Sequence, residues 1–292
     1  MNNVFTGSGV ALVTPFTADM QVDFEALAAL VEYQIENGTH FLVVQGTTGE
    51  SPALSKEEKF DILQEVIEIN DGKCKIVYGV GGNNTAAVAE SLADLPAGID
   101  GILSVSPYYN KPIQQGIVAH YKILADSTEL PIILYNVPGR TGSNVLAETT
   151  LELAEVPNIV AVKEASGNME QIMQIIKHRP NGFGVLSGDD NLTMPLIAAG
   201  ADGVISVVAN AFPALFSAMV HASMNGEFDK ARAAHYALFD ITKMFFEQGN
   251  PGGVKAALAY LDIMEEHMRL PLFPVSDDLR NRIIAETNRI LG

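Results

Sequence analysis

The chain has 292 residues and 48% of them are apolar, so it is long enough to bury a sizeable core. Its 35 acidic and 18 basic side chains give a formal net charge of -17, which argues against nucleic acid or an anionic membrane surface as a partner. The single cysteine, Cys74, excludes a disulfide within the chain. Residues 1–10 lack the basic and apolar regions of a signal peptide, so we expect a soluble, cytoplasmic protein.

Short apolar runs rich in β-branched residues recur along the chain and alternate with helical patterns. Helices are expected at 24–37 and 56–69, and the second opens with a capping box formed by Ser55 and Glu58. Eight strands alternating with helices predict a (β/α)8 TIM barrel, with a doubly wound open sheet as the alternative. The runs that predict strands are 9–15, 40–46, 75–81, 100–107, 131–136, 158–165, 182–188 and 202–209.

The strand patterns stop after the eighth unit, and three helical patterns follow at 226–248, 250–268 and 276–291. We therefore expect a catalytic barrel at 1–225 with a C-terminal three-helix extension at 226–292.

The segment 203–220 is uncharged and long enough to raise the question of a membrane span. Asn210 and Pro213 interrupt it, so a strand, a turn and a helix that opens with proline are the better prediction.

Lys163 directly follows the apolar run of the sixth predicted strand. Alternation would place it on the same face as Ile159 and Ala161, with Val160 and Val162 on the other face. Because strand ends carry the chemistry of a barrel, this predicts an amine in the top layer of the interior. Burial there favours the neutral amine, the nucleophile that forms a Schiff base with a ketone. The alternative is that the strand has ended and Lys163 points into water.

Two other strand ends supply polar groups. The sequence GTTGES offers the hydroxyl and backbone N–H groups of Thr47 and Thr48 to a small carboxylate, with an ordinary turn as the alternative. In YNVPGRTG, Tyr135 alternates with Ile133 and should face the same way, and a core tyrosine is its alternative role. Arg140, on a glycine-flanked loop, suits a bidentate clamp for a carboxylate, with a surface salt bridge as the alternative.

The remaining strand ends give weaker signals. Tandem tyrosines in SPYYNKP are typical of packing or interfaces, and Asp189 and Asp190 in SGDDN are candidates to cap the next helix. These acids, with no basic residue beside them, argue against a phosphate site. The histidines form no HxxxH or HxH pair, so a lysine-dependent mechanism is preferred over a metal-dependent one and no cofactor is expected.

Together, the motifs GTTGES, SPYYNKP, YNVPGRTG, KEASGN and SGDDN resemble those of the dihydrodipicolinate synthase family, over essentially the whole chain. That family belongs to the pyruvate-dependent class I aldolases, which include N-acetylneuraminate lyase. GTTGE and the strand-six lysine are shared across the superfamily, whereas NVPGRTG is more specific to the synthases. The departures are small: Ala161 replaces a usual glycine, Ser166 a usual threonine, and NPGGVKAAL a more typical NPIPVK pattern, which bears on the packing of the appended helices.

The resemblance implies condensation of pyruvate with L-aspartate 4-semialdehyde, giving 4-hydroxy-tetrahydrodipicolinate for diaminopimelate and lysine biosynthesis. Lys163 would form the imine, in a homotetramer where the second tyrosine of the pair crosses the tight-dimer interface. The alternative is an aldolase or lyase for a 2-keto-3-deoxy sugar acid or N-acetylneuraminate, against which the arginine of PGRTG counts. The other residues implied are Tyr135, Thr47 and Tyr109 in a hydroxyl relay, Thr48 for the pyruvate carboxylate, Arg140 for the semialdehyde carboxylate, and Gly188 and Ile205, whose main-chain oxygens would line the pocket.

The resemblance also bears on feedback by lysine, which inhibited relatives bind at a subunit interface. Here Lys56 and Lys59 stand where inhibited bacterial relatives carry histidines, and Ala87 stands in place of a glutamate that receives a lysine amino group. An incoming ammonium would lose an attraction and meet repulsion, so we expect weak inhibition by L-lysine or none. The positions that do match that site are Ser51, Asn83 and Tyr108.

Overall fold

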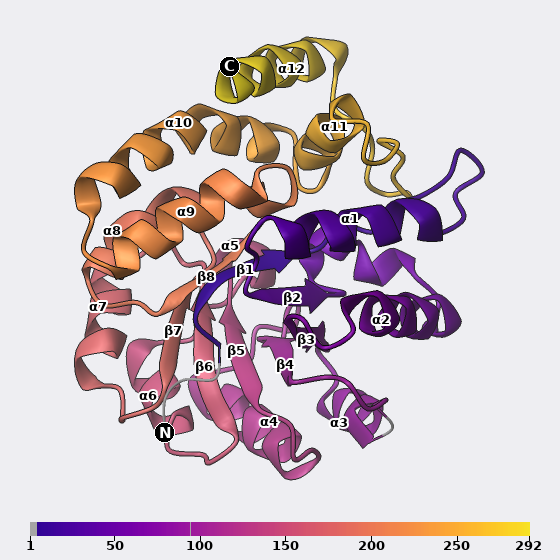
Figure 1. The fold of residues 1–292 in the computed structure, drawn as a ribbon. Coiled ribbons are helices and arrows are strands. Elements are labelled where there is room, and N and C mark those ends of the chain that lie inside the picture. Colours follow the sequence, from indigo (N-terminus) through magenta and orange to yellow (C-terminus); the bar gives the residue numbers. More distant parts are fainter. Residues whose placement is uncertain (1–4, 94) are drawn as a thin grey trace.

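The computed structural model describes residues 5–93 and 95–292. In this part of the chain, eight parallel strands form a closed barrel in which each strand pairs with the next and β8 pairs with β1 (Figure 1). The (β/α)8 prediction is therefore confirmed, and the open sheet is excluded. The strands are β1 Gly7–Ala11, β2 Phe41–Val44, β3 Lys75–Gly79, β4 Gly101–Val105, β5 Ile132–Asn136, β6 Ile159–Glu164, β7 Gly184–Ser187 and β8 Gly203–Ser206.

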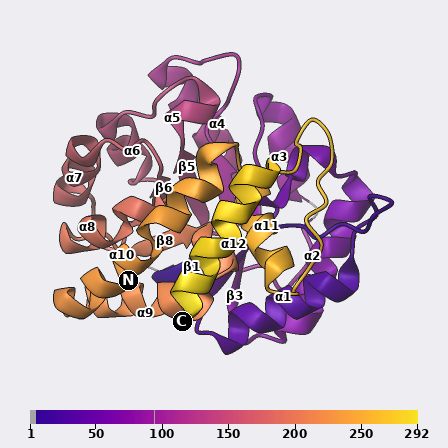
Figure 2. The same cartoon turned by 90° about the horizontal axis from the view of Figure 1, so that it is seen from above.

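Helices lie outside the ring of strands, as the view from above shows (Figure 2). The predicted capping box is confirmed, since the Ser55 side chain accepts from the Glu58 N–H and the Glu58 side chain accepts from the Ser55 N–H. The helices of the barrel are α1 Phe24–Glu36, α2 Lys56–Asn70, α3 Thr85–Ala93, α4 Gln114–Asp126, α5 Pro138–Thr141, α6 Ala147–Leu153, α7 Met169–His178, α8 Thr193–Ala198 and α9 Pro213–Met224. Short 3-10 turns also follow three of the strands: η1 Thr47–Gly49 and η2 Ser51–Ala53 after β2, η3 Asp190–Leu192 after β7, and η4 Val208–Asn210 after β8.

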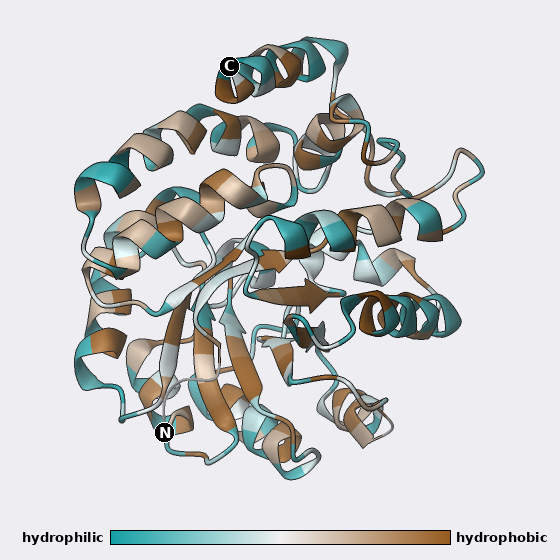
Figure 3. Cartoon of the chain, in the orientation of Figure 1, coloured by the Kyte–Doolittle hydropathy of each residue, from teal (hydrophilic) through white to brown (hydrophobic). Residues whose placement is uncertain are grey.

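Apolar side chains form two layers, one between strands and helices and one inside the ring. The strands are mostly apolar, whereas the helices combine apolar and polar faces (Figure 3). This pattern is expected for parallel strands buried on both sides. The interior layer contains Phe41, Val43, Val77, Leu103, Ile133, Tyr135, Ala161, Leu186 and Ile205.

Strand β6 contains a bulge that corrects one prediction. Its pairing with β5 shifts after Ile159, so that Ile133 faces Ala161 and Val160 is the extra residue. As a result Ile159 joins the outer apolar layer, while Val160 packs against the interior layer together with Ala161. The prediction that Ile159 shares the face of Ala161 was therefore wrong, because the bulge breaks the strict alternation of side chains.

The three-helix extension is present as α10 Phe228–Glu247, α11 Gly252–Tyr260 and α12 Asp277–Leu291. Helix α11 is shorter than predicted, because Asp262 adopts a left-handed conformation with φ 55° and the backbone leaves the helix. Met264 and Met268 have helical spacing in the sequence, but both are buried along an irregular connector. Since α10 packs along α9, the division of the chain at residue 225 stays a prediction.

Glycine is required where α11 meets α10. A Cβ atom at Gly253 would lie 2.5 Å from the Cα atom of Phe245, closer than any normal contact. The NPGGVKAAL sequence therefore allows the two helices to approach backbone to backbone at this point.

The segment 203–220 forms β8, η4 and the start of α9, as predicted. Among the described residues, no helix is long and apolar enough to span a bilayer.

Candidate active site

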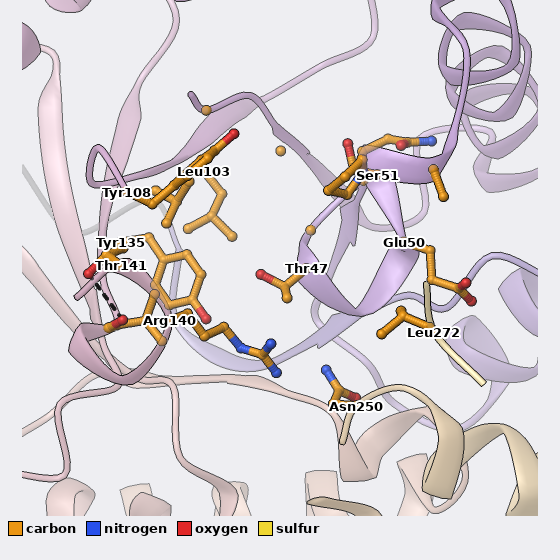
Figure 4. Close-up of a pocket in the computed structure, with 18 of the residues that line it drawn as sticks. Thr47, Glu50, Ser51, Leu103, Tyr108, Tyr135, Arg140, Thr141, Asn250 and Leu272 are labelled. Atoms are coloured by element: carbon orange, nitrogen blue, oxygen red, sulfur yellow. Dashed lines mark hydrogen bonds between the residues drawn. The ribbon is translucent and has the colours of Figure 1, made fainter. Parts of the chain in front are cut away.

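The carboxyl ends of the strands surround two adjoining cavities. The first, which we call the lysine cavity, has a volume of about 380 Å³ and is lined by Lys163. The second, which we call the tyrosine cavity, has a volume of about 410 Å³ and is lined by Tyr108. Their linings overlap, so they form one continuous hollow at the end of the barrel where chemistry is expected. The residues that line both are Gly46, Thr47, Leu103, Tyr135, Val137, Arg140 and Asn250 (Figure 4).

Lys163 is buried at the end of β6, with 6% of its surface exposed. It lies directly opposite Tyr135 in the pairing of β5 with β6, and its Nζ atom is 4.4 Å from the centre of the Tyr135 ring. Gly188 makes room for it, since a Cβ atom there would lie 3.1 Å from the Lys163 Cε atom and 2.7 Å from the Ala165 Cβ atom. The prediction that Lys163 lies in the barrel interior is confirmed.

The threonine motif after β2 forms a tight turn rather than an open loop. Thr47 begins η1, and Glu50 follows it in a left-handed conformation with φ 53°. The Thr14 hydroxyl, at the end of β1, donates to the Gly49 carbonyl at 2.7 Å and holds the turn over the barrel. Thr48 is 3% exposed, and its Oγ1 atom accepts a hydrogen bond from the Asn250 side chain.

A buried ion pair ties this turn to the C-terminal extension. Lys255 on α11 is fully buried, and its Nζ atom lies 2.5 Å from Glu50 Oε1. The same ammonium donates to the carbonyls of Thr14 at 2.7 Å and His267 at 2.8 Å, so two carbonyl oxygens and a carboxylate lie around it. Burial lowers the pKa of Lys255 to about 8, although the Glu50 carboxylate opposes this effect.

Arg140 lies on the short helix α5, and its side chain points into the cavity (Figure 4). In the described part of the chain it has no carboxylate partner, whereas the exposed arginines of α12 all form ion pairs. The surface salt bridge considered as its alternative role is therefore absent from these residues. A guanidinium left free at the edge of a cavity is available to bind an anion through two parallel hydrogen bonds.

The tandem tyrosines differ in their relation to the cavities. Tyr108 lines the tyrosine cavity, and its carbonyl accepts a hydrogen bond from Asn83 at 3.1 Å. Tyr109 has a left-handed conformation with φ 72° and lines neither cavity. With 86% of its surface exposed, Tyr109 is available to a neighbouring molecule.

Three carboxyl groups near the ends of β6 and β7 have raised pKa values. Asp189 lines the lysine cavity, and burial raises its pKa while the charge of Lys163 lowers it. Asp190 does not cap a helix; its Oδ2 atom accepts from the N–H groups of Val207 and Val208, and burial raises its pKa to about 6. Burial also raises the pKa of Glu164, whose oxygens accept hydrogen bonds from the side chains of Asn136, Gln171 and Ser166.

The structure brings most of the predicted site residues together. The lysine cavity is lined by Lys163, Tyr135, Thr47, Thr48, Arg140 and Gly188. Ile205 is buried in the barrel interior and lines neither cavity. Asn250 and the pair formed by Glu50 and Lys255 were not predicted, since nothing in the sequence shows that residues about 200 positions apart meet at one turn.

A closed barrel with a buried strand-six lysine, flanked by hydroxyl groups and an unpaired guanidinium, is typical of enzymes that use an amine as nucleophile. The family model described as the Dihydrodipicolinate synthetase family matches residues 4–289, and the chain belongs to this family.

Individual relatives agree over almost the whole length. A 4-hydroxy-tetrahydrodipicolinate synthase of Parabacteroides distasonis is 54% identical over 270 residues, covering 92% of this chain and 91% of that protein. The crystal structure of dihydrodipicolinate synthase from Aquifex aeolicus is 42% identical, with a TM-score of 0.94 and 98% of each chain covered. The chloride-inhibited enzyme from Acinetobacter baumannii, crystallised with pyruvate, is 37% identical, with a TM-score of 0.94 and 98% of each chain covered.

Proposed function

We propose that this chain is a 4-hydroxy-tetrahydrodipicolinate synthase that condenses pyruvate with L-aspartate 4-semialdehyde in lysine biosynthesis. The observation that carries this proposal is the buried Lys163 amine opposite Tyr135, in a cavity that also contains the unpaired Arg140. The names of the relatives and the family membership point to the same reaction.

The first half of the reaction activates pyruvate. The Lys163 amine attacks the ketone carbon, the oxygen leaves as water, and an imine joins the lysine to the substrate. Thr48, in the turn after β2, binds the pyruvate carboxylate, as its place in the lysine cavity allows. Loss of a proton from the methyl group then gives an enamine, a carbon nucleophile.

The second half joins the two substrates. The enamine carbon attacks the aldehyde carbon of the semialdehyde, whose oxygen takes up a proton and becomes the hydroxyl of the product. The substrate amine then attacks the imine carbon and displaces Lys163, which closes the six-membered ring. Arg140 binds the semialdehyde carboxylate, because its guanidinium reaches the cavity without a partner among the described residues.

Proton transfer needs a hydroxyl next to the imine. Tyr135 lies opposite Lys163 and fills this role, and Thr47 lines the same cavity. Tyr109 extends the relay from a neighbouring subunit. Two observations support this: Tyr109 is exposed, and it lines neither cavity of its own chain. The catalytic unit is then at least a dimer, and we propose a homotetramer built as a dimer of dimers. The main-chain oxygens of Gly188 and Ile205 stay predicted pocket groups.

A coupled assay tests the proposal directly. The chain should turn over pyruvate with L-aspartate 4-semialdehyde and leave N-acetylneuraminate and 2-keto-3-deoxy sugar acids uncleaved. Cleavage of a sugar acid without condensation of the semialdehyde would replace the proposed synthase by a lyase of the same superfamily.

A further inference from the structure

Asn250 links the C-terminal extension to the floor of the site. It lies between α10 and α11, is buried with 6% of its surface exposed, and lines both cavities. Its Nδ2 atom donates a hydrogen bond to the Thr48 Oγ1 atom at 3.0 Å. Figure 4 shows its amide facing the same hollow as Thr47 and the Arg140 guanidinium.

This hydrogen bond decides which way the Thr48 hydroxyl points. A hydroxyl has one proton to donate and two lone pairs that accept. The amide N–H group of Asn250 occupies one lone pair, and the buried Asn250 Oδ1 atom accepts no hydrogen bond from the described residues. Among the described residues, the Thr48 hydroxyl donates no hydrogen bond, so its proton remains available to a ligand in the lysine cavity.

The extension holds the other end of the same turn as well. Lys255 binds Glu50, two residues after Thr48, and also binds the carbonyl of Thr14 at the end of β1. The turn that carries Thr47 and Thr48 is thus fixed at both ends by side chains from the extension. A site held in this way is already arranged before its substrate arrives.

We propose that Asn250 is a positioning residue for the pyruvate site: its amide directs the Thr48 hydroxyl proton toward the substrate carboxylate. This inference rests on the proposed function, since it takes pyruvate as the ligand of Thr48. Asn250 acts through Thr48 and does not itself react. The three-helix extension is then part of the catalytic unit, although its helices lie outside the barrel.

The test compares the Michaelis constants for the two substrates. Asn250→Ala removes the group that orients the Thr48 hydroxyl, so the KM for pyruvate should rise about threefold, because the proton is then shared among three staggered positions. The KM for the semialdehyde and the kcat at saturating pyruvate should stay within about twofold, because neither depends on the Thr48 proton. Gln248→Ala is a matched control: it removes an amide at the end of α10 that binds Ser276, away from both cavities, and should change neither KM.

A nearly isosteric second variant guards against a folding defect. In Asn250→Asp the carboxylate only accepts hydrogen bonds, so it accepts the Thr48 proton, and its charge also repels the pyruvate carboxylate. Its KM for pyruvate should exceed that of Asn250→Ala, with a melting temperature close to that of the parent chain. A KM at or below the Asn250→Ala value in a folded Asn250→Asp protein would overturn the proposed direction of the hydroxyl.

A double-mutant cycle separates positioning from general structural support. Thr48→Val already lacks the hydroxyl, so adding Asn250→Ala should raise the KM for pyruvate no further. Additive effects would mean that Asn250 acts independently of Thr48, and the inference would fail.

Trapping of the pyruvate adduct with borohydride separates this inference from the proposed function. If the parent chain forms no trapped adduct, the proposed function fails. If the parent chain forms the adduct and Asn250→Ala binds pyruvate equally well, only this inference fails.

Discussion

Tyr135 and Lys163 face each other across the pairing of β5 and β6, with the Lys163 amine 4.4 Å from the centre of the Tyr135 ring. The contact follows from strand register, since residues paired in neighbouring parallel strands point to the same side. In the proposed mechanism, this contact places the nucleophile and the proton donor on rigid elements of the barrel. The segments that follow β2 and β5 then supply only the groups proposed to bind carboxylates, Thr48 and Arg140.

Replacing Arg140 should separate the two substrates. In Arg140→Ala the semialdehyde loses a charge-assisted, bidentate contact worth roughly 1.5–3 kcal/mol, or about ten- to a hundredfold in kcat/KM. Trapping of the pyruvate imine with borohydride should be almost unaffected, because that step does not involve the semialdehyde. Equal loss of both activities would show that Arg140 is structural or serves pyruvate.

The relay should cross between subunits. Tyr109→Phe and Thr47→Val should each lower turnover while the fold stays intact, because each removes one hydroxyl. Mixed oligomers of the two variants should regain part of the activity, since some sites receive an intact Thr47 from one chain and an intact Tyr109 from another. Tyr236→Phe is a suitable control, since this tyrosine is exposed on α10. No recovery after demonstrated subunit exchange would place the relay within one chain.

Inhibition by L-lysine should be weak, with half-inhibition well above 1 mM. Lys56 and Lys59 lie on α2 and add positive charge, and Ala87, which is exposed on α3, offers no carboxylate to an incoming ammonium. Two unit charges about 4 Å apart interact by about 4 kcal/mol at an effective dielectric of 20, similar to the whole binding energy at 1 mM.

A gain-of-function variant tests the same charge argument. Ala87→Glu should lower the concentration of L-lysine that gives half-inhibition, because it supplies a carboxylate for the incoming ammonium. A titration of the parent chain with half-inhibition below roughly 1 mM would contradict this account of the site.

Asp190 should make stability depend on pH. Burial raises its pKa from 3.8 to about 6, so between these values the folded state binds more protons than the unfolded state. The free energy of unfolding should therefore fall as the pH rises through this window, by up to about 3 kcal/mol from this group. Asp190→Asn keeps an acceptor for the N–H groups of Val207 and Val208 and should remove this component. Denaturant titrations at pH 4 and 7 would measure it, and an unchanged difference between the two proteins would contradict the assignment.

Local patterns were sufficient to predict the barrel and the place of Lys163, because apolar runs, caps and strand ends depend on neighbouring residues. The same patterns placed Ile159 on the wrong face, since a bulge depends on how two strands pair and not on either sequence alone. They also extended α11 beyond Tyr260, because buried residues of a connector share helical spacing by coincidence.

The contacts of the extension were beyond sequence reasoning for a different reason. Asn250 and Thr48 are 202 positions apart, and a polar side chain gives no sign of its distant partner. A buried lysine such as Lys255 also resembles a surface lysine in the sequence until its carboxylate partner is seen.

The central claim is that Lys163 is the nucleophile. Incubation with pyruvate and borohydride, followed by peptide mass spectrometry, should find a reduced pyruvyl group on Lys163 alone. The buried Lys255 is an internal control, because it is paired with Glu50, donates to two carbonyls and lines neither cavity. Label on Lys163 and on no other lysine is the result expected; label on a different lysine, or none at all, would contradict the Schiff-base mechanism.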